Sequence, residues 1–78
     1  MTIGPSKLRF HARLLEAHER YEHDLYAFET QYDMDSATFY QRFEAGELGD
    51  AMDFFEWAGL CELRQDLLEK IQRVESAV

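Results

Sequence analysis

The chain has 78 residues, of which 46% are hydrophobic and 14% aromatic, and its net charge at pH 7 is −8. This length allows one small domain with a marginal core, and the apolar content excludes an intrinsically disordered chain. A single cysteine excludes an intrachain disulfide and favours a reducing compartment. We expect a cytoplasmic protein, because no stretch resembles a signal peptide and no run is apolar enough to span a membrane.

The charge is distributed unevenly along the chain. Residues 1–20 carry four basic and two acidic side chains, residues 21–62 carry eleven acids against Arg42 alone, and residues 63–78 balance three against three. The acidic middle repels phosphate, which argues against direct nucleic-acid binding and leaves the weakly basic N-terminal part as a minor DNA-binding alternative. It favours association with a basic protein, nucleases among them.

The first predicted helix spans about residues 6–32 and follows a flexible N-terminus of residues 1–5, with Ser6 as N-cap. Side chains spaced alternately by four and three residues form one continuous seam along this helix. The seam consists of Lys7, His11, Leu14, His18, Tyr21, Leu25, Phe28 and Tyr32. At about 1.5 Å per residue this helix is nearly 40 Å long, so it must lie along another long helix.

The second predicted helix is short and spans about residues 35–45. Asp35 is a suitable N-cap, and Met34 can pack on Phe39 as a hydrophobic staple. Gly46 suits the left-handed position that ends a helix.

The third predicted helix spans about residues 50–76, after a turn at Gly49, with Asp50 as its cap. Its seam alternates three- and four-residue spacing, and a second apolar row flanks it. The seam consists of Trp57, Leu60, Arg64, Leu67, Ile71, Val74 and Val78, and the flanking row of Phe54, Cys61 and Leu68.

These elements predict an all-α fold in one domain, residues 6–78: an antiparallel hairpin of two long helices with the short helix across its closed end. Two seams plus the extra aromatic rings exceed what such a hairpin can bury. We therefore expect a homodimer that completes a four-helix bundle, or a different partner on the same surface. The residues predicted for this oligomer seam are Leu14, Tyr21, Leu25, Phe28, Leu60, Leu67, Ile71 and Val74.

No catalytic residue, cofactor or metal site is predicted. His18 and Glu22 have the four-residue spacing of a zinc site on a helix, but the pair alone is a weak signal, so a metal-dependent enzyme or sensor using His11, His18 and Glu22 stays a minor alternative. The carboxylates follow no calcium-loop pattern and suit helix caps and an interaction face. Cys61 lies beside the apolar seam, as expected of an inert thiol.

Aromatic and acidic side chains gather in residues 39–60. Phe55 is rotated about 100° from Phe54 around the helix, so one large ring should be exposed and available as an anchor of the kind found in binding hot spots. The residues predicted to bind a partner are Phe43, Glu44, Glu47, Asp50, Asp53, Phe55, Glu56 and Trp57.

Residues 32–60, with Met34-Asp35-Ser36 leading into FYQRFEAGELGDAMDFFEWAGL, resemble small prokaryotic proteins of toxin–antitoxin gene pairs. These proteins carry a pattern like "YGMS…F…RFEAGELGD…DFFEWA", in which GELGD followed closely by DFFEW is the most specific part. The resemblance implies an antitoxin-like or accessory subunit that binds and restrains a toxin, commonly of the ribonuclease type. Antitoxins often also bind DNA through a helix-turn-helix or ribbon-helix-helix segment, and this sequence shows neither.

Two functions from different classes follow from these patterns. The first is a non-enzymatic, antitoxin-like protein whose acidic aromatic surface covers a basic active-site or RNA-binding face, an acidic mimic of nucleic acid being a variant of it. The second is a structural homodimeric helical adaptor of a larger complex, in which the acids only keep the particle soluble.

Overall fold

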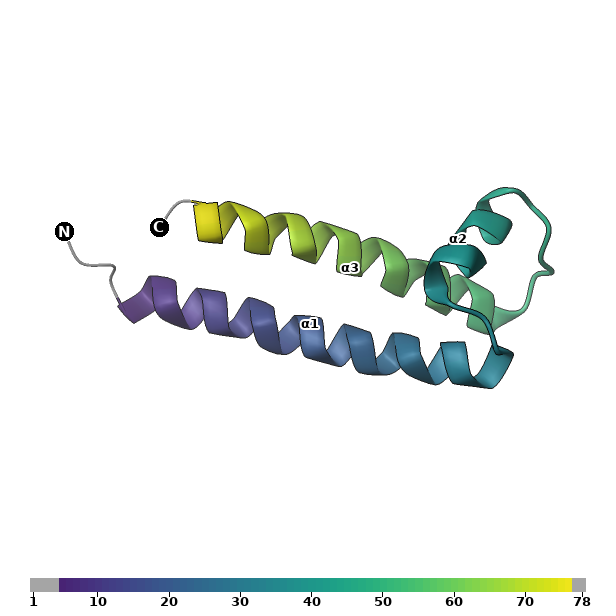
Figure 1. Cartoon of the computed structure of the whole chain (residues 1–78), viewed down its shortest axis with the longest axis horizontal. Coiled ribbons are helices and arrows are strands. Elements are labelled where there is room, and N and C mark those ends of the chain that lie inside the picture. Colours follow the sequence, from purple (N-terminus) through teal and green to yellow (C-terminus); the bar gives the residue numbers. More distant parts are fainter. Residues whose placement is uncertain (1–4, 77–78) are drawn as a thin grey trace.

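The computed structural model describes the backbone of residues 5–76 and the side chains of residues 9–76. All regular elements in this range are helices: α1 (Pro5–Tyr32), α2 (Ser36–Glu44) and α3 (Met52–Ser76). The predicted order of long, short and long helices is confirmed. Helices α1 and α3 lie side by side and antiparallel, and α2 packs across one end (Figure 1). We call this the closed end, and the opposite end, where α1 begins and α3 ends, the open end.

The molecule is a slender hairpin of 53 × 21 × 17 Å. Among the described residues, no helix is both long enough and apolar enough to cross a membrane. Of the flexible N-terminus predicted for residues 1–5, residues 1–4 lie outside the described range and Pro5 belongs to α1. The N-cap prediction for Ser6 is therefore wrong. Proline suits the first helical position because an amide hydrogen would find no helical partner there.

Two carboxylates hold the start of α2. Asp35 is the N-cap, as predicted, and its Oδ1 accepts a hydrogen bond of 2.7 Å from the amide of Thr38. This backbone hydrogen bond lowers the pKa of Asp35 below the usual value of an aspartate, so the cap stabilises the helix at neutral pH and weakens as acid protonates the carboxylate. Glu29 of α1 reaches across and accepts a hydrogen bond of 2.7 Å from the amide of Ser36. The start of α2 is thus fixed from α1 as well as locally.

The end of α2 forms a Schellman motif at the predicted glycine. Gly46 has φ 73°, its amide donates to Phe43 at 3.1 Å, and the amide of Glu47 donates to Arg42 at 3.0 Å. The side chains of Arg42 and Glu47 lie where this motif usually makes an apolar contact, and they form an ion pair of 3.7 Å instead. Gly46 and this pair set the direction in which the chain leaves α2.

We expect Gly46→Ala to lower the free energy of unfolding by about 1–2 kcal/mol, because a residue with a Cβ is strained at positive φ. An added Cβ would meet no heavy atom within 4 Å at either Gly46 or Gly49, but only Gly46 has positive φ. Gly49→Ala is therefore the matched control and should change stability by less than about 0.5 kcal/mol. Urea unfolding followed by circular dichroism measures both. Equal losses in the two variants would contradict this account of the turn.

Helix α3 begins at Met52, two residues after the predicted cap at Asp50. The amide of Phe54 donates to the carbonyl of Ala51 at 3.0 Å, so the first turn closes on Ala51. Asp50 consequently belongs to the α2–α3 connection, where its side chain is exposed.

The main core lies at the closed end and is centred on Trp57. The indole is fully buried and stacks on Phe39 with ring centroids 3.8 Å apart and an interplanar angle of 2°. Phe28 stacks on Trp57 at 5.6 Å and 11°. The indole N–H donates to Ser36 Oγ at 2.9 Å, which pairs the one polar atom of the ring. Trp57 therefore joins all three helices.

A second core follows the hairpin toward the open end. Leu14, Leu67 and Ile71 are buried there, with Ala17, Tyr21 and Val74 packed around them. The residues predicted as an oligomer seam thus face each other within one chain, and Leu25, Phe28 and Leu60 belong to the closed-end core in the same way. This assignment is corrected because the two apolar seams satisfy each other in an antiparallel hairpin. Phe28 and Leu60 are only half-buried, and they also line a groove on the outside of the hairpin.

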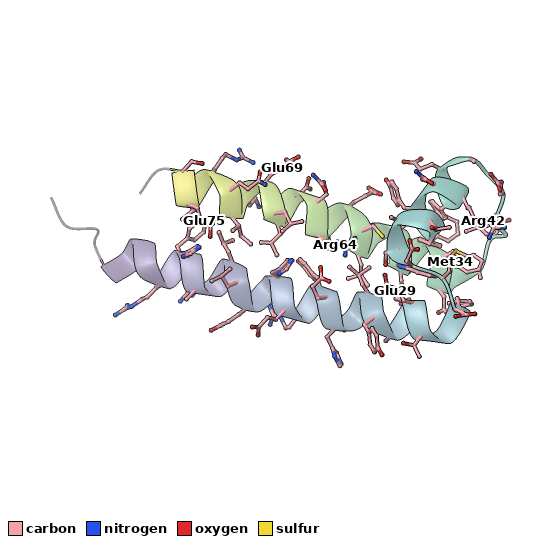
Figure 2. All side chains as sticks on the ribbon, in the orientation of Figure 1. Glu29, Met34, Arg42, Arg64, Glu69 and Glu75 are labelled. Atoms are coloured by element: carbon pink, nitrogen blue, oxygen red, sulfur yellow. The ribbon has the colours of Figure 1, made fainter. Side chains whose placement is uncertain are left out.

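Within residues 9–76, the two histidines and the arginine of the seams each lie near a carboxylate, although His11 Nε2 makes no hydrogen bond. Glu22 Oε1 lies 3.2 Å from Arg64 Nη1 and 3.4 Å from His18 Nε2. Nearer the open end, His11 Nε2 lies 3.5 Å from Glu75 Oε2. Figure 2 shows Arg64 and Glu75 extending from α3 toward α1. These side chains interrupt the apolar seams where a carboxylate can reach them.

Candidate protein-binding surface

An aromatic pair lies on the outside of the closed end. Phe55 is 53% exposed, and its ring meets the half-buried ring of Phe43 edge to face, with centroids 5.7 Å apart. Phe43 in turn packs against the buried Phe39 at 5.7 Å. The exposed ring is therefore supported by the core through Phe43. A rigid, half-exposed aromatic ring is what an interface anchor requires.

Three exposed acidic residues lie between Phe43 and Phe55 in sequence. Glu44 ends α2, and Glu47 and Asp50 lie in the connection to α3, all three exposed. Arg42 is the one basic residue of residues 21–62, and it is already paired with Glu47. We define the closed-end surface as the half-buried Phe43 together with five exposed residues. These are Glu44, Glu47, Asp50, Met52 and Phe55.

Tyr40 lies near two carboxylates, Glu44 of α2 and Glu62 of α3. The nearby Glu44 carboxylate, together with desolvation and the charge of Glu62, raises the pKa of Tyr40 to about 12. The phenol therefore stays protonated and neutral, and it leaves the negative field of the two carboxylates uncancelled.

Met52 was not predicted as a site residue. It is 75% exposed at the first position of α3, three residues before Phe55 and hence on the same side of the helix. The signal for it is present in the sequence, because Met52 belongs neither to the Trp57 seam nor to the row of Phe54 and Cys61. An apolar residue of α3 outside both rows does not face α1, so it is left exposed.

Three of the predicted binding residues lie elsewhere. Trp57 is fully buried, so its ring is a core residue and cannot meet a partner in this fold. Asp53 is half-buried and accepts a hydrogen bond of 2.6 Å from the Tyr32 hydroxyl, which raises the pKa of Tyr32. Gln31 Nε2 also donates to Asp53 at 3.5 Å. Asp53 thus ties the start of α3 to the end of α1.

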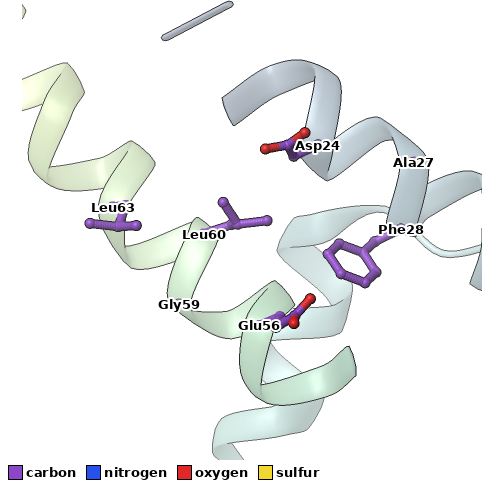
Figure 3. Close-up of a pocket in the computed structure, with 7 residues that line it drawn as sticks. All are labelled: Asp24, Ala27, Phe28, Glu56, Gly59, Leu60 and Leu63. Atoms are coloured by element: carbon purple, nitrogen blue, oxygen red, sulfur yellow. The ribbon is translucent and has the colours of Figure 1, made fainter. Parts of the chain in front are cut away.

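Glu56, the third of them, lies where α1 and α3 enclose a groove. The groove is lined by Asp24, Ala27, Phe28, Glu56, Gly59, Leu60 and Leu63. Figure 3 shows the side chains of Asp24 and Phe28 from α1, and of Glu56 and Leu60 from α3, directed into the same space. The groove has an apolar floor and one carboxylate from each helix beside it. Glu56 therefore lines this groove, one helical turn after Met52 of the closed-end surface.

A polar cleft between α2 and α3 contains nothing suited to nucleophilic catalysis. Its lining includes Ser36, Tyr40, Cys61, Glu62, Arg64 and Asp66. Ser36 Oγ already accepts the Trp57 hydrogen bond, and burial raises the pKa of the Cys61 thiol, which disfavours the reactive thiolate. Within residues 9–76 no group of three histidine, cysteine or carboxylate side chains is placed to hold a metal ion.

The chain matches no family model, no curated protein and no solved structure. The resemblance of residues 32–60 to antitoxin-like proteins therefore stays a prediction.

Proposed function

We propose that this chain is a non-enzymatic, antitoxin-like protein that binds and neutralises a basic partner, such as a nuclease-type toxin, through the closed-end surface. The observation that carries the proposal is the half-exposed ring of Phe55, held against Phe43 among acids that have one basic residue near them in sequence. Exposed aromatic rings on a supported surface supply affinity, and the surrounding charge selects a basic partner.

The charge arrangement also suits inhibition of a nuclease. A nuclease binds phosphate with lysine and arginine side chains, and the carboxylates of Glu44, Glu47 and Asp50 offer those groups an alternative partner. Glu44, Glu47 and Asp50 lie between Phe43 and Phe55 in sequence, and interfaces commonly combine an apolar core with a polar rim. Bound in this way, the closed end would block entry of the nucleic-acid substrate. Opposite charges would also speed association, most strongly at low salt.

The test is a calorimetric titration of this chain with the product of the open reading frame adjacent to its gene. We expect Glu47→Lys combined with Asp50→Lys to weaken binding at least about tenfold, because both charges then repel a basic face. The matched control combines Glu19→Lys with Glu69→Lys, the same charge change on exposed residues of the open half (Figure 2 labels Glu69). The proposal fails if both pairs weaken binding equally, or if neither does.

A homodimeric helical adaptor is the second candidate function. It is favoured by the half-exposed apolar side chains along the hairpin, Phe10, Leu15 and Leu63 among them, which the internal seam leaves uncovered. A dimer of hairpins would form the four-helix bundle that the composition suggests. The two functions are compatible where dimerisation leaves Phe55 and the acids of the closed-end surface exposed.

A further inference from the structure

We propose that a second copy of this chain lies antiparallel on the groove between α1 and α3, with Phe10 of each copy inserted between Ala27 and Gly59 of the other. This inference rests on the homodimer considered above, and names its face, its orientation and its contacts. It does not depend on the binding of a basic partner at the closed end.

The groove offers space that nothing in the described part of the chain occupies. Ala27 lines it from α1 and Gly59 from α3. A Cβ added at Gly59 would meet no heavy atom within 4 Å, so packing inside the hairpin does not require a glycine there. Glycine in a helix interior costs about 1 kcal/mol relative to alanine. A close approach from outside the hairpin accounts for that cost.

Phe10 is placed to fill such a groove in another copy. Its ring is 50% exposed. Phe10 lies five full helical turns before Phe28, and Arg9 lies five full turns before Ala27. Residues separated by whole turns share a side of the helix, so Phe10 and Arg9 project from the side of α1 that forms the groove. Arg13 precedes Asp24 by about three turns and shares that side too. The groove-forming side of α1 therefore carries an exposed ring between two basic residues near the open end.

The charges beside Phe10 complement those beside the groove. Phe10 is flanked by Arg9 and Arg13, and the groove is flanked by Asp24 and Glu56. In an antiparallel pair of α1 helices, the midpoint between Phe10 and Ala27 is also the midpoint between Arg13 and Asp24. One register therefore seats the ring and pairs these charges. The same register places Arg9 beside Phe28, which lines the groove together with Glu56.

This arrangement selects a second copy as the occupant. A two-fold axis beside the middle of α1 makes every contact twice. The Phe10 ring of each chain then fills the groove of the other chain, and neither groove is left open. Arg9 and Arg13 of one copy then face the acidic side chains beside the groove of the other, Asp24 and Glu56. A parallel arrangement would instead place like charges together.

Sedimentation velocity on the full chain tests the dimer by charge exchange. We expect Asp24→Arg and Arg13→Asp each to raise the dimer dissociation constant at least about tenfold, because each dimer would then hold two repelling pairs. An equimolar mixture of the two variants should dimerise like the wild type, since every repelling pair becomes an attracting one. Both positions are exposed, and recovery in the mixture shows that each variant is folded.

A second variant fills the groove from within. Gly59→Leu should leave the chain monomeric while keeping or raising its melting temperature, because leucine is the better helix former. The proposal is overturned by a wild-type chain that stays monomeric, by single variants that dimerise as the wild type does, or by a mixture that stays monomeric. Asp24→Arg should leave binding of the basic partner unchanged, and Phe55→Ala should leave the dimer unchanged. Failure of one proposal is thereby distinguished from failure of the other.

Discussion

Trp57→Ala is expected to lower the free energy of unfolding by about 3–5 kcal/mol, the largest effect of any single substitution considered for this chain. The indole is fully buried, stacks on Phe39 and Phe28, and pairs its N–H with Ser36. Alanine removes all of these contacts and leaves a cavity where three helices meet. Small domains are marginally stable, so a loss of this size would leave much of the chain unfolded.

Urea unfolding followed by circular dichroism measures the effect, with Phe55→Ala as control. Phe55 is another large aromatic ring two residues earlier in α3, but 53% of it is exposed. Its removal should cost less than about 1 kcal/mol, because surface substitutions seldom cost more. Two variants of equal stability would contradict the division of these rings into core and surface. The single tryptophan also gives an independent readout, since a buried indole emits at shorter wavelength in the folded wild type.

The second large effect concerns binding. Phe55→Ala is expected to weaken the complex with the basic partner by about 2 kcal/mol or more, roughly thirtyfold, which is the range of interface hot spots. The reason is the pairing of Phe55 with Phe43, which holds the ring in place before a partner arrives.

Leu63→Ala is the matched control for this loss, because Leu63 is 49% exposed on the same helix but lies on the groove. Binding should change less than about threefold in that variant. Calorimetric titration of the two variants against the same partner supplies the comparison. Stronger weakening by Leu63→Ala than by Phe55→Ala would place the partner on the groove and contradict the closed-end surface.

The helical architecture followed from local patterns, which act over short distances in sequence. The seams, the cap at Asp35 and the left-handed Gly46 each depend on neighbouring residues, and the structure confirms the order of helices that they predicted. The start of α3 was placed two residues early because Asp50 has the chemistry of a cap without its position. Cap chemistry alone does not decide which of several adjacent polar residues begins a helix.

The candidate site was predictable only in part, because it depends on contacts between helices. Sequence spacing indicated that one ring near Trp57 is exposed, and Phe55 is that ring. It could not show that the Trp57 indole is covered by α2, that Asp53 is held by Tyr32, or that Glu56 turns toward the groove. Each of these outcomes depends on the register in which distant segments pack.

Mapping the bound face by nuclear magnetic resonance tests most directly whether the closed-end surface binds a basic protein. The isotope-labelled chain is titrated with the product of the adjacent open reading frame while its amide resonances are followed. We expect the largest shifts at Phe43, Glu44, Glu47, Asp50 and Phe55, with the open half of α1 and α3 nearly unchanged. Shifts concentrated at the open end or along the groove, or a titration that moves no resonance, would contradict the claim.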